Sequence, residues 1–178
     1  MSRRILEATV ELLGEVGYSE LTVDAVAARA TVGRPAIYRR FRGKSELCVA
    51  AIGSLLPPPV VNVGGTHEQR LRGLFMALAQ PSLARYVGLV GELLGLQPTQ
   101  PELAAAWRES VFLPRREAGL AIIREARDAG VLRADVDLDF IIDTLTGHLL
   151  ARVWRGLPLD DAWRERTWEQ LWAAVSRR

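Results

Sequence analysis

The sequence is poor in the residues that carry covalent and metal chemistry. Its 178 residues include one cysteine, Cys48, and two histidines, His67 and His148. A single cysteine excludes a disulfide within the chain. The chain also has no Glu-x-x-His pair, no glycine-rich phosphate loop and no Gly-x-Ser-x-Gly turn, which are the usual marks of metal, nucleotide and nucleophile sites. We therefore expect no enzyme and no cofactor, although chemistry by carboxylates alone stays open.

We expect neither a membrane-spanning nor a secretory segment in this sequence. Its long uncharged run, Leu47–Gly65, contains three prolines in a row and a pair of glycines, which a continuous membrane helix would not tolerate. Near the N-terminus, Glu7, Glu11 and Glu15 interrupt any apolar signal core. We expect a cytoplasmic protein.

The composition indicates a folded helical protein. Hydrophobic residues make up 49% and charged residues 25% of the chain, which is a globular balance. The apolar spacing is helical almost throughout, without sustained strand alternation. The sequence predicts an all-α fold of about nine helices. After four N-terminal helices, the last of them over Lys44–Leu56, we expect helices over 67–80, 82–96, 101–129, 138–155 and 161–176.

Capping residues predict where several helices begin and end. Gly17 ends the first helix, Thr22 caps the second, and Gly33 caps the third, which accepts Pro35 in its first turn. Later in the chain, Thr66 and Gln69 have capping-box spacing, and Asp137, Gly156 and Asp160 supply further ends and caps. Pro114 predicts a kink or break within 101–129.

The prolines Pro57–Pro59 stop the fourth helix, and a loop is expected over Val60–Gly65. We place a domain boundary near residues 46 to 60. The prediction is an N-terminal three-helix domain over 1–46 and a larger helical domain over 47–178.

Positive charge is concentrated in the stretch "GRPAIYRRFRGKSEL". Against the single acid Glu46, this stretch carries the five cations Arg34, Arg39, Arg40, Arg42 and Lys44, in a chain whose net charge is only +2. An anionic partner is the natural explanation, and a solvated basic face is the alternative.

A helical wheel orders the side chains of this stretch. Ile37 and Phe41 share an inward face, whereas Pro35, Ala36 and Arg39 point the opposite way. Such a face suits the DNA major groove, because small residues permit close approach, an alanine methyl can contact thymine, and arginine can bond guanine O6 and N7. Flanking side chains would bind phosphates, as would the N-terminal amides of the helix capped by Thr22.

The stretch "TVDAVAARATVGRPAIYRRFRGKSEL" resembles the helix-turn-helix signature of the TetR family of transcriptional regulators. The resemblance covers Ile5 to about Leu47 and implies a homodimer that presents two recognition helices to a double-stranded operator. It also implies repression relieved by a small effector. Carried over by position, the residues that would read the bases are Arg34, Pro35, Ala36 and Arg39. The residues that would contact phosphates are Thr22, Tyr38, Arg40, Arg42 and Lys44, of which Arg42 is included because of its charge.

The chain departs from the family pattern at four positions. Thr31 stands where the family usually has the turn glycine, and Gly33 replaces the usual Ser or Thr cap. Pro35 and Arg39 replace the more common Gly and His. These departures are compatible with the helix-turn-helix architecture, but they leave the operator sequence unpredictable.

The larger domain is expected to hold the dimer contact and the effector site. Helical spacing and aromatic content indicate a dimer interface, with intramolecular core as the alternative. The candidates are Phe140, Thr144, Gly147, Ala151, Trp154, Trp168, Leu171, Trp172 and Val175. The family's pocket lies between the middle helices, where an apolar lining favours a hydrophobic effector. The candidates there are Phe75, Met76, Tyr86, Val90, Leu94, Trp107, Phe112 and His148.

The roles of three polar side chains and one alternative function remain open. Arg85 joins Tyr86 and His148 as a polar anchor for the effector, but each of these side chains is compatible with plain core packing. The rival function is a helical ligand-binding or adaptor protein that does not bind DNA. Salt-dependent binding to duplex DNA separates it from a regulator.

Overall fold

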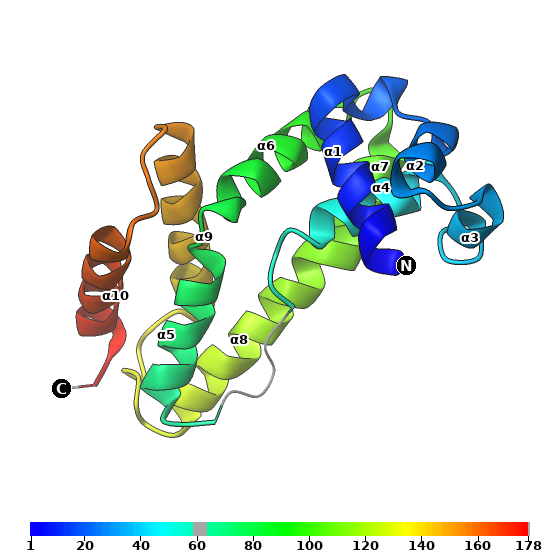
Figure 1. Ribbon diagram of the computed structural model, residues 1–178. Helices are drawn as coiled ribbons and strands as arrows, with labels where there is room; N and C mark the ends of the chain where they lie inside the picture. Colours follow the sequence, from blue (N-terminus) through cyan, green and yellow to red (C-terminus); the bar gives the residue numbers. More distant parts are fainter. Residues whose placement is uncertain (59–63, 178) are drawn as a thin grey trace. The chain divides into compact units, whose positions relative to one another are not determined.

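The computed structural model of the protein describes residues 1–58 and 64–177 (Figure 1). Within these ranges it has ten α-helices, one π-helical turn and no strand; one isolated bridge pairs Leu132 with Ser176. The all-α prediction is confirmed. None of the helices in the described ranges has the length and apolarity needed to cross a membrane. The loop predicted at Val60–Gly65 lies mostly outside the described residues.

The chain divides into two compact units. The first consists of Met1–Leu56 and Arg85–Leu113, and the second of Pro57–Ala84 and Pro114–Arg178. The domain boundary predicted at residue 46 separates parts of the chain by their expected function, and it stays a prediction.

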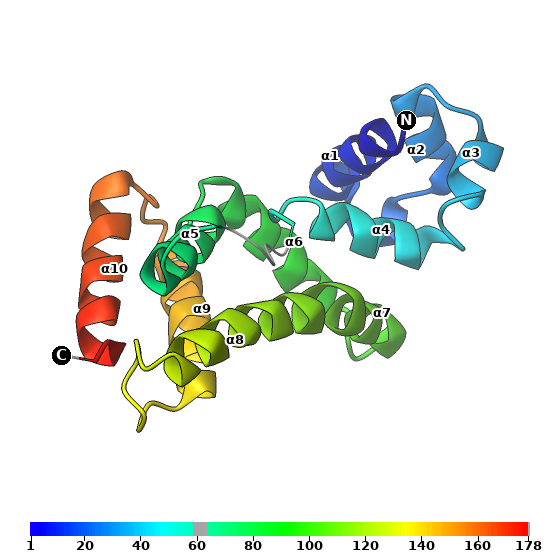
Figure 2. The ribbon, with the colours of Figure 1, turned by 90° about the horizontal axis from the view of Figure 1, so that it is seen from below.

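Four helices form the N-terminal part of the first unit: α1 (Ser2–Glu20), α2 (Val23–Ala30), α3 (Arg34–Tyr38) and α4 (Lys44–Gly53). The regular part of α1 ends at Gly17, which has φ +73° and ψ 174°. The Thr22 hydroxyl accepts a hydrogen bond from Ala25 N at 3.1 Å, as predicted for the N-cap of α2. Helix α1 packs on α2 and α4, and α2 packs on α3. Figures 1 and 2 both place α3 at the edge of this unit.

The turn between α2 and α3 is built on a threonine in the left-handed region. Thr31 has φ 53° and ψ 52°, a conformation that is unfavourable for a β-branched residue. Arg4 of α1 supports the turn, because its Nη2 donates to Ala30 O at 2.8 Å and to Thr31 O at 3.2 Å. These bonds satisfy carbonyls that the end of α2 leaves without helical partners.

The first unit also contains most of α6 (Ser82–Gly95), then α7 (Pro101–Trp107) and the π-helical turn η1 (Arg108–Phe112). Gly53 of α4 lies against η1, where a Cβ would be 3.0 Å from Val111 Cγ2. The helix predicted over 101–129 is interrupted by η1, just before Pro114. Pro114 has no N–H to donate, so a wider turn in this segment fits the predicted break.

The second unit contains α5 (His67–Leu78), α8 (Leu113–Asp128) from its second residue onward, α9 (Leu138–Trp154) and α10 (Asp161–Val175). The predicted caps are confirmed at Thr66, Asp137 and Asp160, and Thr66 forms the full capping box with Gln69. Residues from α8, α9 and α10 form the core around Ile123 and Ile141.

We predict that Thr31→Gly raises the free energy of unfolding by about 0.5–1 kcal/mol. The left-handed conformation costs threonine roughly 1–2 kcal/mol, and the greater freedom of glycine in the unfolded chain cancels part of the gain. Urea unfolding measures the change. The free energy of unfolding of Thr31→Asn should lie between those of the wild type and Thr31→Gly, because asparagine tolerates the left-handed region. A loss of stability in both variants would contradict the assignment of strain at Thr31.

Candidate nucleic-acid interface

The recognition helix is held by two buried residues. Ile37 is 1% exposed and Ala36 is 7% exposed. The inward prediction for Ile37 is confirmed, whereas the outward prediction for Ala36 is wrong. The wheel assumed a helix that continues through Phe41, but α3 ends at Tyr38, and both Ala36 and Ile37 lie on its inner side. Ala36 therefore offers no exposed methyl to a base.

The outer side of this segment carries free cations. Arg39 and Arg42 are exposed, and neither side chain forms a hydrogen bond or ion pair with the other described residues. Pro35 is exposed beside them, and Tyr38 keeps 48% of its surface exposed. A solvent-exposed guanidinium without an acid partner can bind an anion without first breaking an ion pair.

Arg34 has a fixed position at the start of α3. Its Nε lies 2.8 Å from Asp24 Oδ1 of α2. The hydrogen bond with Tyr38 and the charge of Asp24 raise the pKa of Arg34 above its usual value. Both members of the ion pair are more than half exposed, so the pair adds little stability, but it orients the guanidinium beside α3.

Three other predicted phosphate contacts are positioned by neighbouring elements. Arg40 donates to Ser2 Oγ at 3.0 Å and to Ala36 O at 2.9 Å. Lys44 Nζ donates to Ser19 O at 3.0 Å. Thr22 is exposed at the N-terminus of α2, and its hydroxyl proton remains available to a phosphate oxygen.

The predicted pocket residues fall in both units. In the first, Trp107 Nε1 donates to the Tyr86 hydroxyl at 3.2 Å, and Trp107 stacks on Phe112 at 5.5 Å. Val90 is buried, whereas Leu94 is 38% exposed.

In the second unit, Phe75 is 2% exposed and packs between Trp163 and Trp168 at 6.2 and 6.4 Å. Met76 is half-buried on the same helix. His148 is exposed and stacks on Trp163 at 5.4 Å. These contacts support core packing for Phe75, and an effector role for any of the eight residues stays a prediction.

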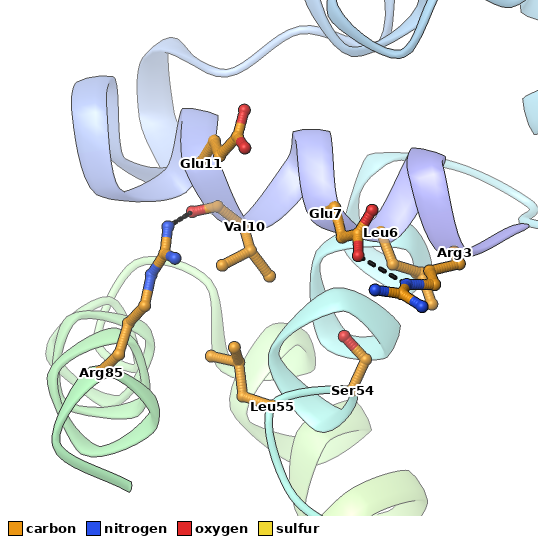
Figure 3. A pocket seen from close by; sticks show the side chains of 8 residues that line it. All are labelled: Arg3, Leu6, Glu7, Val10, Glu11, Ser54, Leu55 and Arg85. Atoms are coloured by element: carbon orange, nitrogen blue, oxygen red, sulfur yellow. Dashed lines mark hydrogen bonds and ion pairs between the residues drawn. The ribbon is translucent and has the colours of Figure 1, made fainter. Parts of the chain in front are cut away.

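A groove of about 510 Å³ lies among α1, α4 and α6 of the first unit, and none of the eight predicted pocket residues lines it. Figure 3 shows the Val10 and Leu55 side chains pointing toward each other and Arg85 reaching from α6 to Val10 O, at 3.2 Å. The lining residues are Arg3, Leu6, Glu7, Val10, Glu11, Ser54, Leu55 and Arg85. Within the described residues, no group of three or more His, Cys, Asp or Glu side chains is arranged to hold a metal ion.

The predicted dimer residues divide between surface and core. Phe140 and Trp154 of α9 are 67% and 75% exposed. Thr144, Gly147 and Ala151 lie exposed between them at helical spacing, so one face of α9 presents an uncovered stripe.

The prediction for α10 is corrected. Trp168 and Val175 are only 5% and 8% exposed, and Trp168 stacks on Phe75 and Trp172 within the subunit. Leu171 and Trp172 are half-buried against the core of the second unit. Trp168 and Val175 therefore pack inside the subunit, because helical spacing marks a buried face without showing which neighbour buries it. An interface role for Leu171 and Trp172 stays a prediction.

We predict that Cys48 is inert in the folded protein. The side chain is fully buried, and burial raises the pKa of the Cys48 thiol to about 12. Its reaction with a disulfide reagent at pH 8 should be at least about 100-fold slower than in unfolding concentrations of urea. Because the unfolded thiol ionises near about pH 8.5, the difference in pKa also lowers the free energy of unfolding as the pH rises from there toward 12. Rapid, complete labelling of the native protein would contradict this prediction.

The family models match both parts of the chain. The model for bacterial regulatory proteins of the tetR family matches residues 5–51, and the tetracyclin repressor-like C-terminal domain matches residues 64–171. The HTH-type transcriptional regulator Rv1556 of Mycobacterium tuberculosis is 31% identical over 153 residues, which are 83% of this chain and 73% of that protein. The DNA-binding transcriptional repressor TetR of Mycobacteroides abscessus is 29% identical over 90% of this chain and 86% of its own length.

Solved structures agree with this assignment. The TetR family transcription regulator SCO0332 has a TM-score of 0.65 and 26% identity, with 98% of each chain covered. The regulator FadR of Bacillus subtilis, solved in complex with stearoyl-CoA, shares the fold with a TM-score of 0.69, 19% identity and coverage of 96% and 97%. The relatives are regulators of transcription, not enzymes, and the chain belongs to the TetR family of bacterial helix-turn-helix transcriptional regulators.

Proposed function

We propose that the protein is a homodimeric repressor that binds a palindromic operator and is released from it by a small hydrophobic effector. The observation that carries this proposal is the pair of exposed cations, Arg39 and Arg42, beside a recognition helix whose Ile37 is buried. An exposed basic face on a helix-turn-helix is suited to duplex DNA. Repression is supported by the relative that is named a DNA-binding transcriptional repressor. Operator binding also requires the compartment that holds bacterial DNA, the cytoplasm.

Within the proposed complex, α3 enters the major groove. Arg34, Pro35 and Arg39 face the bases, and an arginine that bonds guanine O6 and N7 gives sequence discrimination. Ala36 is left out of this set because it is buried.

Thr22, Tyr38, Arg40, Arg42 and Lys44 contact phosphates and hold the register of the helix. Three of these side chains are cationic, so a dimer would neutralise roughly six phosphates. The logarithm of the binding constant should then fall with the logarithm of the salt concentration with a slope of about −5. Binding should therefore weaken steeply as salt is added.

The dimer is proposed to form through the exposed stripe of α9. Phe140 and Trp154 are large aromatic residues at its two ends, whereas a Cβ at Gly147 would meet no described atom within 4 Å outside the backbone of its own helix. Aromatic anchors around a small-residue centre suit close helix packing against a second copy. Residues 1–46 would then bind DNA, and residues 47–178 would bind the effector and the partner subunit.

The effector is proposed to be hydrophobic. The middle helices carry the buried pair Tyr86 and Trp107, joined by a hydrogen bond, and a fold neighbour was solved with stearoyl-CoA. Effector binding would favour a dimer in which the two recognition helices no longer match successive major grooves, roughly 34–36 Å apart. Operator affinity would fall as a result.

Selection of bound fragments from genomic DNA tests the operator proposal. The wild-type protein should enrich one palindromic sequence, and Arg39→Ala should relax the preference at one position per half-site, by about 1–3 kcal/mol of discrimination. Arg108→Ala is the matched control, because Arg108 is an exposed arginine of η1 without a described partner. Enrichment of no sequence, even at low salt, would favour the adaptor function.

The mass of the protein in solution tests the dimer proposal. Trp154→Glu buries a charge in the proposed interface, so sedimentation should show a dimer for the wild type and a monomer for the variant at micromolar concentration. Val16→Glu places the same charge on an apolar residue of α1 that is 46% exposed, and it should leave the dimer intact. An unchanged dimer in Trp154→Glu would move the interface away from α9.

A further inference from the structure

Two side chains of α6 reach α1 and bond to its backbone. Arg85 Nη2 donates to Val10 O at 3.2 Å, and Glu92 Oε1 accepts from Tyr18 N at 2.8 Å. The two α6 residues are seven positions apart, which places them on the same side of the helix. Arg85 spans the groove of Figure 3 at one end of this connection.

The Glu92 contact uses a backbone site that only glycine leaves open. Gly17 has φ +73°, so the helix is broken there and the next amide, Tyr18 N–H, turns to the Glu92 carboxylate. A Cβ at Gly17 would lie 2.7 Å from Glu92 Oε1. The carboxylate therefore occupies the space that a side chain at position 17 would take.

Tyr18 connects this site to the start of α4. The Tyr18 ring is 8% exposed, and its hydroxyl lies 2.9 Å from Ser45 Oγ. Lys44 Nζ sits 4.5 Å from the centroid of the same ring and donates to the neighbouring Ser19 O. The residue that binds Glu92 thus also positions the lysine that we assign to a phosphate.

We propose that Glu92, assisted by Arg85, is a positioning residue through which α6 sets the DNA-binding arrangement of Lys44. The proposal rests on the operator binding proposed above and deepens it, because it names a contact that holds a phosphate-binding lysine in place. Without the Glu92 carboxylate, the Tyr18 amide loses its acceptor, and the aromatic ring beside Lys44 is held less firmly. Operator affinity then falls without any change in the base-reading side chains.

A double-mutant cycle on the selected operator tests this coupling. Glu92→Ala should weaken binding about fivefold, the size expected for loss of a partly exposed charge-assisted hydrogen bond. It should also lower the salt slope by about one per subunit, as Lys44→Ala does. The double variant should bind no more weakly than the weaker single variant, because both changes remove the same phosphate contact.

Three further variants separate positioning from general damage. Glu92→Gln keeps an acceptor for Tyr18 N–H and should restore affinity to within about twofold of the wild type. Tyr18→Phe removes only the hydroxyl bond to Ser45 and should reproduce part of the Glu92→Ala loss. Glu102→Ala removes an exposed acid of α7 and should change neither the affinity nor the slope.

The outcomes distinguish this proposal from the one on which it rests. Additive effects of Glu92→Ala and Lys44→Ala, or an unchanged salt slope in Glu92→Ala, would overturn the positioning role while operator binding stands. Urea unfolding of Glu92→Ala provides the stability control, since a lower stability alone does not alter the number of phosphate contacts. If the wild type itself shows no sequence-specific binding, the operator proposal fails and the positioning role fails with it.

Discussion

The burial of Ile37 is the constraint on which the DNA-binding surface depends. Helix α3 has only five residues, Arg34–Tyr38, too few to be stable without tertiary packing. Its direction is therefore set by what it buries, namely Ile37 and the small Ala36. The left-handed Thr31 and the two bonds from Arg4 fix the turn that leads into it. With the inner side fixed, the arginines that follow α3 remain in solvent.

Some arginines of the first unit bind other elements of that unit. Arg29 pairs with Glu11 and Glu15 of α1, and Arg4 binds carbonyls at the end of α2. These side chains join helices to one another. Arg39 and Arg42 have no such contacts among the described residues, so their guanidinium groups can bind an anion without first breaking an ion pair.

Features set by local chemistry were predictable from the sequence. The caps at Thr22, Thr66 and Asp160 depend on bonds within three residues, so their spacing is readable in the chain. The side on which Ala36 lies depends instead on where α3 stops. The burial of Trp168 depends on Phe75, which is distant in the sequence, and a helical stripe does not identify such a neighbour.

The connection between α6 and α1 was not predicted for the same reason. Glu92 and Tyr18 are 74 residues apart, and a single acid in a mostly apolar helix shows nothing of its acceptor role. The signal that was available is Gly17, because a glycine that ends a helix turns the following amide out of the helical pattern. The buried Tyr18 and Lys44, the first residue of α4, complete the contact.

The most direct test of the account is the ratio of affinities for the selected operator and for an unrelated duplex of equal length. At about 50 and about 200 mM salt, both affinities should fall steeply, since phosphate contacts supply the common part of the binding. The ratio should stay at about 10³ or more in the wild type and drop by about 10-fold or more in Arg39→Ala. Equal affinity for both duplexes at both salt concentrations would contradict sequence reading by α3 and leave only a basic surface.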